Sequence, residues 1–393
     1  MNFQTHRKTV KNLLRRNKWP GLLGGKYAFS PYQACAHACK YCDGRAERYY
    51  VEGDFERDIT VRVNSPELLL NELQHRREFG PICIGSGVSD PYQPAEKTER
   101  LMARCCEVLA EHAYPVVVMT KSALVRRDLP YFKTIHSRGG FLLMMTLTML
   151  DDRLRSVIEP GAATVEDRLA TLEEFRSAGL DAGVLAMPIL PLLADGESDI
   201  DALFSRFRLL GVQFILPMAL TLKPGRQKDC FMTTIGDHFP EYLDHYRRLY
   251  GADDQWGKPA RDYLTMMTSR LRNLAAKHRL PTLAPHGLYR TKFMIHDELL
   301  ILLRDMQELY ATRGVDIRPL RRACRAYHAW LEKRRTFYAR RRNLDYAGLT
   351  DEVTGAIARD ELLPVIGNGK LNRFIKKVAV ERREFDYLTL RLR

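Results

Sequence analysis

Short apolar runs alternate with longer amphipathic stretches over roughly residues 27–250. The apolar runs predict six strands, at residues 27–30, 82–85, 115–119, 141–147, 184–189 and 214–220. The amphipathic stretches predict helices at residues 66–74, 96–110, 123–135, 165–177 and 200–210. Strands that alternate with helices in this way favour repeated βα units and a parallel sheet. The pattern therefore predicts an α/β fold with six such units.

The character of the chain changes after residue 250. Residues 261–279 and 297–312 carry helical periodicity, and the stretch that follows them is dense in charge. We therefore expect three parts: a basic N-terminal arm over residues 1–26, a barrel-forming region over 27–250, and a helical, basic C-terminal region over 251–393.

Composition narrows the function classes. The 393 residues are 45% hydrophobic and 28% charged, which is typical of a globular chain with a sizeable core. A formal net charge of +14 favours an anionic partner. No apolar run approaches the roughly 18 residues that a membrane helix needs, and the basic N-terminal arm lacks the apolar segment of a secretory signal. Eight cysteines in so long a chain argue against a disulfide scaffold and predict a reducing, cytoplasmic setting.

Three of the cysteines are packed into the segment Cys35-Ala-His-Ala-Cys39-Lys-Tyr-Cys42. A loop this short can turn three thiolates onto one centre. Iron–sulfur clusters are held by cysteine thiolates, and three ligands on a [4Fe–4S] cube leave one iron without a protein donor. A zinc site completed by His37 or by a distant group is the alternative, but the second cysteine or histidine pair of such sites is missing.

The spacing Cys-x3-Cys-x2-Cys, with Tyr41 before the third cysteine, resembles the signature loop of the radical S-adenosylmethionine (SAM) superfamily. The resemblance implies a partial (β/α)6 barrel of the TIM type, with the basic helical region as an extension. It also implies a [4Fe–4S] cluster on Cys35, Cys39 and Cys42 and SAM on the open iron. Reductive cleavage of SAM would yield a 5'-deoxyadenosyl radical, with an electron donor such as flavodoxin or ferredoxin.

Further segments resemble the branch of the superfamily that is similar to spore photoproduct lyase. They are Asp90-Pro91-Tyr92-Gln93-Pro94, Thr120-Lys121, Thr146-Leu147-Thr148, Glu159-Pro160 and Arg168-Leu169. The resemblance implies a set of SAM contacts: Tyr41, Ser86, Gly87, Asp90, Lys121, Thr146, Glu159, Arg168 and Pro188. For Arg168 the resemblance implies either a SAM contact or a brace. From the residues alone, Lys121 also fits a snorkelling surface lysine, and Arg168 fits a helix-surface ion pair with Glu166 or Glu173.

The resemblance fails at one position. Photoproduct lyases carry a hydrogen-donating cysteine where this chain has Gly87. Cys83, four residues upstream on the predicted strand, and Tyr92 are then the remaining candidate catalytic residues, although a buried thiol and a core tyrosine explain them as well. Cys105 and Cys106 fall in a helical pattern and give no auxiliary cluster.

Residues 321–342 hold nine cations against the single acid Glu332, interleaved with aromatic side chains. Arginines can contact phosphates and aromatic faces can stack on bases, which predicts a DNA- or RNA-binding surface. The predicted contacts are Arg321, Arg322, Arg325, Arg334, Arg335 and Arg340. An amphipathic helix whose aromatic residues pack on the protein explains the pattern equally, and a helix on a membrane surface is less favoured because no lipidation signal accompanies it.

Three functions compete at this point. The first is a radical SAM enzyme acting on a nucleic acid or nucleotide, as in repair or modification of DNA or RNA. The second is a radical SAM enzyme acting on a peptide or small metabolite. The third is a basic nucleic-acid-binding protein, not an enzyme, with a structural zinc loop. The sequence leaves open the substrate, the hydrogen donor, whether SAM is consumed, and the oligomeric state.

Overall fold

The structure is a computed structural model that describes residues 2–17, 22–85, 88–252, 254–290, 292–341 and 347–393. It divides into two compact units. The first holds Met1–Arg16, Tyr27–Gln74 and Ile82–Thr282, and the second holds Asn17–Lys26, His75–Pro81 and Leu283–Arg393. These boundaries differ from the expected ones, because the N-terminal arm is shared between the units and residues 251–282 join the first unit.

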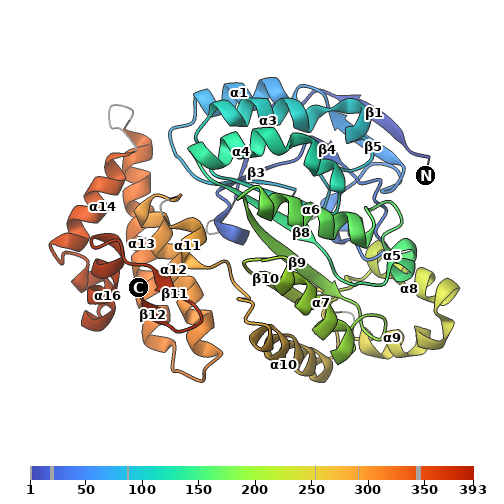
Figure 1. The fold of residues 1–393 in the computed structure, drawn as a ribbon. Helices are drawn as coiled ribbons and strands as arrows, with labels where there is room; N and C mark the ends of the chain where they lie inside the picture. Colours follow the sequence, from blue (N-terminus) through green and yellow to red (C-terminus); the bar gives the residue numbers. More distant parts are fainter. Residues whose placement is uncertain (1, 18–21, 86–87, 253, 291, 342–346) are drawn as a thin grey trace. The chain divides into compact units, whose positions relative to one another are not determined.

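Six parallel strands form the centre of the first unit (Figure 1). They are β3 (Tyr27–Phe29), β6 (Ile82–Ile84), β7 (Val116–Thr120), β8 (Phe141–Thr146), β9 (Asp181–Ile189) and β10 (Ile215–Ala219). Their spatial order is their chain order, and β2 (Arg15–Arg16) adds an antiparallel edge to β3. The predicted α/β fold of the partial (β/α)6 kind is confirmed. Buried apolar side chains dominate β6, β7 and β8, as expected of strands covered on both faces.

Helices connect successive strands of this sheet, and α8 and α9 follow its last strand, β10. They are α1 (Ser65–Gln74), α2 (Glu96–Glu99), α3 (Leu101–Glu111), α4 (Leu129–Arg138), α5 (Asp152–Ile158), α6 (Val165–Ser177), α7 (Glu197–Leu209), α8 (Arg226–His238) and α9 (Leu243–Leu249). Figure 1 shows α1, α3 and α4 side by side along the sheet, and they pack on one another. Helix α10 (Arg261–Lys277) packs on α7 and β10, which is why residues beyond 250 belong to this unit.

A second, three-stranded sheet explains the place of the N-terminal arm. Strand β1 (Gln4–Lys8) pairs in parallel with β5 (Asp58–Arg62), and β4 (Tyr32–Gln33) pairs antiparallel with β5. The N-terminal arm is therefore part of the folded first unit, because the backbone groups of β1 form one edge of this sheet. Strand β4 leads directly into the cysteine segment.

The second unit is mainly helical. Its elements are α11 (His286–Tyr289), α12 (Ile295–Ala311), α13 (Arg318–Arg340), α14 (Gly348–Ala358), α15 (Leu363–Ile366), α16 (Gly369–Ala379), β11 (Phe385–Asp386) and β12 (Arg391–Leu392). Its core joins Leu299 and Leu302 of α12 to Tyr327 and Leu331 of α13 and Ile375 of α16. These positions recur at helical spacing, so each helix buries one apolar stripe.

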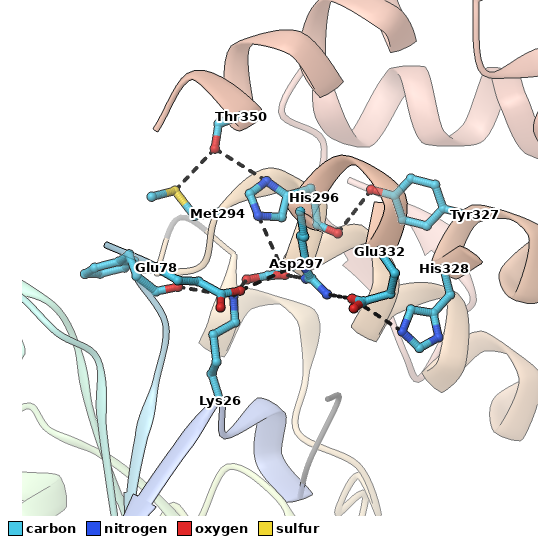
Figure 2. Close-up of polar contacts among 11 residues, drawn as sticks. Lys26, Glu78, Met294, His296, Asp297, Tyr327, His328, Glu332 and Thr350 are labelled. Atoms are coloured by element: carbon cyan, nitrogen blue, oxygen red, sulfur yellow. Dashed lines mark hydrogen bonds and ion pairs between the residues drawn. The ribbon is translucent and has the colours of Figure 1, made fainter. Parts of the chain in front are cut away.

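A buried ion network ties the short segments of the second unit to its helices (Figure 2). Lys26 Nζ lies 2.7 Å from Asp297 Oδ2 and 2.9 Å from Glu78 Oε1, and it donates to the carbonyl of Phe79 at 3.2 Å. Arg335 pairs with the other carboxylate oxygen of Asp297. Lys26, Asp297 and Arg335 are at most 3% exposed. Buried charges persist only when they are paired, so this network joins residues 17–26 and 75–81 to the helical segment.

None of the described helices is long and apolar enough to cross a membrane.

Candidate active site

The three cysteines of the signature segment share one tight loop after β4. The loop turns through hydrogen bonds from Ala38 N to Cys35 O at 3.1 Å and from Cys42 N to Cys39 O at 3.3 Å. Ala38 takes a left-handed backbone conformation with φ of 55°, which folds the loop back on itself. In this loop the cysteines are close enough that, in addition to burial, Cys35 and Cys42 raise the pKa of Cys39, and Cys35 raises the pKa of Cys42. Burial raises the pKa of Cys42 to about 11, with a further rise from Cys35.

Side chains from the loop after β6 hold the cysteine loop in place. Gln93 Oε1 accepts from Ala36 N at 2.8 Å, and Gln93 Nε2 donates to Ala34 O at 3.1 Å. Ser89 Oγ donates to the same carbonyl at 2.8 Å. Gln93 is fully buried, and the sequence offered no signal for this role beyond its place in the Asp-Pro-Tyr-Gln-Pro segment.

Gly161 contacts the backbone of the cysteine loop directly. Its N–H donates to His37 O at 3.0 Å. A Cβ at this position would collide with the carbonyl oxygen of Ala36 and would lie 2.9 Å from the Cα of His37. Only glycine leaves room for this backbone contact.

Lys121 follows the carboxyl end of β7 and points its ammonium group toward the cysteine loop. Lys121 Nζ lies 5.6 Å from the centroid of the Tyr41 ring and makes no hydrogen bond or ion pair with any described residue. Burial favours the neutral amine, but Cys39 and Glu159 together raise the pKa of Lys121. A cation here lowers the cost of thiolates in the loop and suits an anionic group of a ligand.

Asp90 fixes the backbone that presents Lys121. Its carboxylate accepts from Lys121 N at 2.7 Å, Thr120 Oγ1 at 2.7 Å and Tyr92 N at 2.9 Å, and it lies 3.4 Å from Nδ1 of His37. Although burial opposes ionisation, His37 and these donors lower the pKa of Asp90 to about 2. The structure thus gives Asp90 a positioning role, and direct contact with a cofactor stays a prediction.

Arg168, Glu159 and Tyr41 form a buried cluster at the carboxyl end of β8. Arg168 donates to Thr146 O at 3.1 Å and Ala163 O at 3.0 Å, and its Nη2 lies 2.5 Å from Glu159 Oε2. The hydroxyl of Tyr41 donates to the other oxygen of Glu159. Arg168 thus links the end of β8 to the start of α6 and forms no ion pair with Glu166 or Glu173 among the described residues, while contact of Arg168, Glu159 or Tyr41 with a cofactor stays a prediction.

The remaining predicted cofactor residues fall into two groups. Thr146 ends β8, and Pro188 lies in β9 after a cis peptide bond from Met187. Ser86 and Gly87 lie outside the described residues.

The two candidate catalytic residues have packing partners. The hydroxyl of Tyr92 donates to Asp128 Oδ2 at 2.9 Å, and Cys106 Sγ lies 3.7 Å from the Tyr92 hydroxyl oxygen. Cys83 sits in the middle of β6 between Ala28 and Val117, and burial raises its pKa to about 12. These surroundings give both side chains a structural role, and a catalytic role for either stays a prediction.

The donor set fits a [4Fe–4S] cluster and SAM. The three thiols of the cysteine loop stay the predicted ligands, while the ammonium of Lys121 and the buried Oγ1 of Thr148 have no hydrogen-bond partner among the described residues. No group of three or more described His, Cys, Asp or Glu side chains is drawn together tightly enough for a single metal ion. A cube takes its cysteines at separate iron corners, so it does not need such a tight approach.

Comparisons with known proteins agree with this arrangement. The radical SAM superfamily model matches residues 29–204. An uncharacterized protein of Mycobacterium bovis is 31% identical over 282 residues, covering 70% of this chain and 81% of that protein. An uncharacterized protein of Methanocaldococcus jannaschii is 32% identical over 175 residues, covering 44% of this chain and 64% of that protein.

Among solved structures, a spore photoproduct lyase variant with bound AdoMet and dinucleoside spore photoproduct shares the fold. It superposes with a TM-score of 0.51 at 16% identity, covering 70% of this chain and 79% of that one. The chain belongs to the radical SAM superfamily, whose members use a [4Fe–4S] cluster and SAM.

Proposed function

We propose that this radical SAM enzyme acts on a nucleic acid or nucleotide. The observation that carries the proposal is the exposed face of α13. Arg321, Arg322, Arg325, Lys333 and Arg340 are exposed on this one helix, and none pairs with an acidic side chain among the described residues. Unbalanced arginines along one helix face attract phosphates, whose release of counterions drives binding.

The structure corrects part of the predicted contact set. Arg335 is 3% exposed and pairs with Asp297, so the prediction that it contacts nucleic acid is wrong. It faces the core because it lies four residues after Leu331, on the buried stripe of the helix. Arg334 Nε lies 2.5 Å from Glu352 Oε1, so the charge of Arg334 is balanced by this carboxylate.

The aromatic residues of α13 are also committed to packing. Tyr327 is fully buried and donates to His296 O at 3.1 Å, while Trp330 and Tyr338 pack against the helical core. Phe337 lies beneath the guanidinium groups of Arg334 and Arg341. The proposal therefore rests on charge, since stacking of bases on these rings has no support.

A structural neighbour adds support. The spore photoproduct lyase that shares this fold holds AdoMet and a dinucleoside photoproduct. This chain has Gly87 where photoproduct lyases place a hydrogen-donating cysteine, so we propose a nucleic-acid substrate without assigning that particular reaction.

In this proposal the side chains of the site have separate tasks. Cys35, Cys39 and Cys42 would hold the cluster, which when reduced supplies the electron that cleaves SAM to methionine and a 5'-deoxyadenosyl radical. Lys121 would pair with the carboxylate of SAM, and Thr146 would contact its carboxylate or ribose. Arg168, Glu159 and Tyr41 would keep the wall of the site rigid. A reductant such as flavodoxin or ferredoxin would deliver the electron.

Salt-dependent binding tests the proposed substrate class. The cluster-loaded protein should bind short DNA or RNA with an affinity that falls steeply with salt, by a log–log slope of about 0.7 to 0.9 per phosphate neutralised. The combined variant Arg321→Gln, Arg325→Gln and Arg340→Gln should bind more weakly with a shallower slope.

The matched control removes three exposed cations of the first unit, Lys133→Gln, Arg261→Gln and Arg272→Gln. It should bind as the unchanged protein does. Equal affinity in both triple variants, or binding that ignores salt, would contradict the proposal and favour a peptide or small metabolite as substrate.

A further inference from the structure

A cavity of about 380 Å³ opens in the first unit beside the cysteine loop. This volume lies in the range of pockets that hold small organic ligands, roughly 300–1,000 Å³. Its wall includes Ala34, the residue before the first cysteine, and Ser89 from the loop after β6. Both residues belong to the segments that build the candidate active site, so a ligand in this cavity would lie next to it.

Two arginines line the cavity. Arg15 comes from β2, where it pairs with Ala28 of β3, and Arg62 comes from the end of β5. Arg62 Nη1 donates to Ser30 O at 2.9 Å, which anchors its guanidinium at the carboxyl end of β3. The two residues thus approach the same strand end from two different sheets.

No acid balances this pair. The cavity wall contains no aspartate or glutamate, and neither arginine forms an ion pair with any described residue. The two groups also repel each other: burial and the charge of Arg15 both lower the pKa of Arg62. Two neighbouring arginines without a counter-charge destabilise the folded protein by their repulsion. An anion that binds to both guanidinium groups removes this repulsion and forms charge-assisted hydrogen bonds with them.

The rest of the wall suits an organic anion larger than an inorganic ion. Asn12 and Gln33 offer amide groups, and Tyr49 and Phe29 offer ring surface. A phosphate between two guanidinium groups, with a sugar or base on the aromatic surface, would use all of these features.

We propose that this cavity binds a phosphate group of the substrate through Arg15 and Arg62. The inference rests on the proposed function, because it takes the substrate to be a nucleic acid or nucleotide. It adds a second phosphate site, next to the cysteine loop and made by other residues than the basic face of α13. The cavity would thereby fix the position of the nucleotide beside the reactive centre.

The test compares a charged and a neutral form of one small ligand. Isothermal titration of the cluster-loaded protein would use a dinucleoside phosphate and its uncharged methylphosphonate analogue. Arg15→Gln and Arg62→Gln should each weaken binding of the charged form by about tenfold or more, since each removes a charge-assisted hydrogen bond. Binding of the neutral analogue should not change.

Two variants guard against trivial explanations. Arg16→Gln removes the same charge from the neighbouring position of β2, which does not line the cavity, and should bind both ligands as the unchanged protein does. Arg62→Lys keeps the charge, so intermediate affinity would show that a loss in Arg62→Gln is not misfolding.

The outcomes separate the two proposals. If both arginine variants bind the charged ligand normally while the α13 variant loses oligonucleotide affinity, the cavity assignment fails and the proposed function stands. If the protein binds neither oligonucleotides nor the dinucleoside phosphate, the proposed function fails. Tighter binding of citrate than of the dinucleoside phosphate would overturn the assignment of phosphate and favour a carboxylate.

Discussion

The carboxylate of Asp90 accepts a hydrogen bond from the backbone N–H of Lys121 at 2.7 Å. The loop after β6 thereby fixes the end of β7, the neighbouring strand, and with it the lysine whose ammonium group faces Tyr41. Two strand ends of the barrel are coupled through one side chain. A side chain that is held in place before the cofactor binds loses less conformational entropy on binding, so its contribution to affinity is larger.

The first prediction concerns this coupling. Asp90→Ala leaves Lys121 in place but removes the three hydrogen bonds that the carboxylate accepts, from the backbone N–H of Lys121, the hydroxyl of Thr120 and the backbone N–H of Tyr92. SAM affinity should fall by about tenfold, the equivalent of one lost charge-assisted hydrogen bond. Equilibrium binding of SAM to the cluster-loaded variant measures this. Thr120→Val removes only one of the three bonds and should show a smaller loss; an equal loss in both variants would contradict the coupling.

The second prediction concerns Gly161. Gly161→Ala would force a methyl group against the carbonyl oxygen of Ala36 and displace the cysteine loop. Overpacking of this kind costs about 1–3 kcal/mol, and the shift should lower the iron bound per chain after anaerobic reconstitution. Iron and sulfide analysis checks it. Gly236→Ala meets its nearest neighbour only at 3.6 Å and should load iron normally. Full loading of Gly161→Ala would show that the loop is not held as tightly as proposed.

The third prediction concerns the buried ion network of the second unit. Arg335→Met removes one cationic partner of the buried Asp297 carboxylate and leaves Lys26 paired with it. Removing one partner of a buried ion network costs about 3–5 kcal/mol, so urea should unfold the second unit at clearly lower concentration. Arg359→Gln breaks an exposed pair with Glu361 and should change little. If the two variants unfold alike, the network contributes no more than a surface ion pair.

The fourth prediction is a pH dependence. Burial raises the pKa of Asp305 to about 7, although the hydroxyl of Tyr387 donates to it at 2.6 Å and that of Tyr289 at 3.3 Å. Between pH 4 and pH 7 the folded state then binds a proton that the unfolded state releases. The stability of the second unit should therefore fall as pH rises through this window, by at most about 1.4 kcal/mol per pH unit.

Asp305→Asn tests the source of this dependence. The amide oxygen can still accept from the tyrosines but carries no charge, so the variant should lose the slope and exceed the unchanged protein in stability above pH 7. Denaturant unfolding at several pH values measures both. A slope that survives the substitution would assign the effect to another group.

The sequence by itself determined those features that depend on neighbours along the chain. The six strands followed from the alternation of apolar and amphipathic segments, and the radical SAM signature followed from three cysteines within eight residues. Lys121 and Arg168 became candidate SAM contacts because the short segments around them resemble the photoproduct-lyase branch. These features are readable because hydrogen bonding within βα units, and the closure of a short loop, involve residues that are close in sequence.

Only the tertiary structure decided which arginines are buried in ion pairs, which are exposed and which line a cavity. Arg335 and Arg340 belong to one charged stretch, but the turn of the helix buries the first against Asp297 and exposes the second. Arg15 and Arg62 come from separate strands and share a cavity only because β2 and β5 converge near the end of β3. Burial and charge pairing between distant segments depend on how the chain packs, and periodicity within one segment carries no information about the partner that will face it.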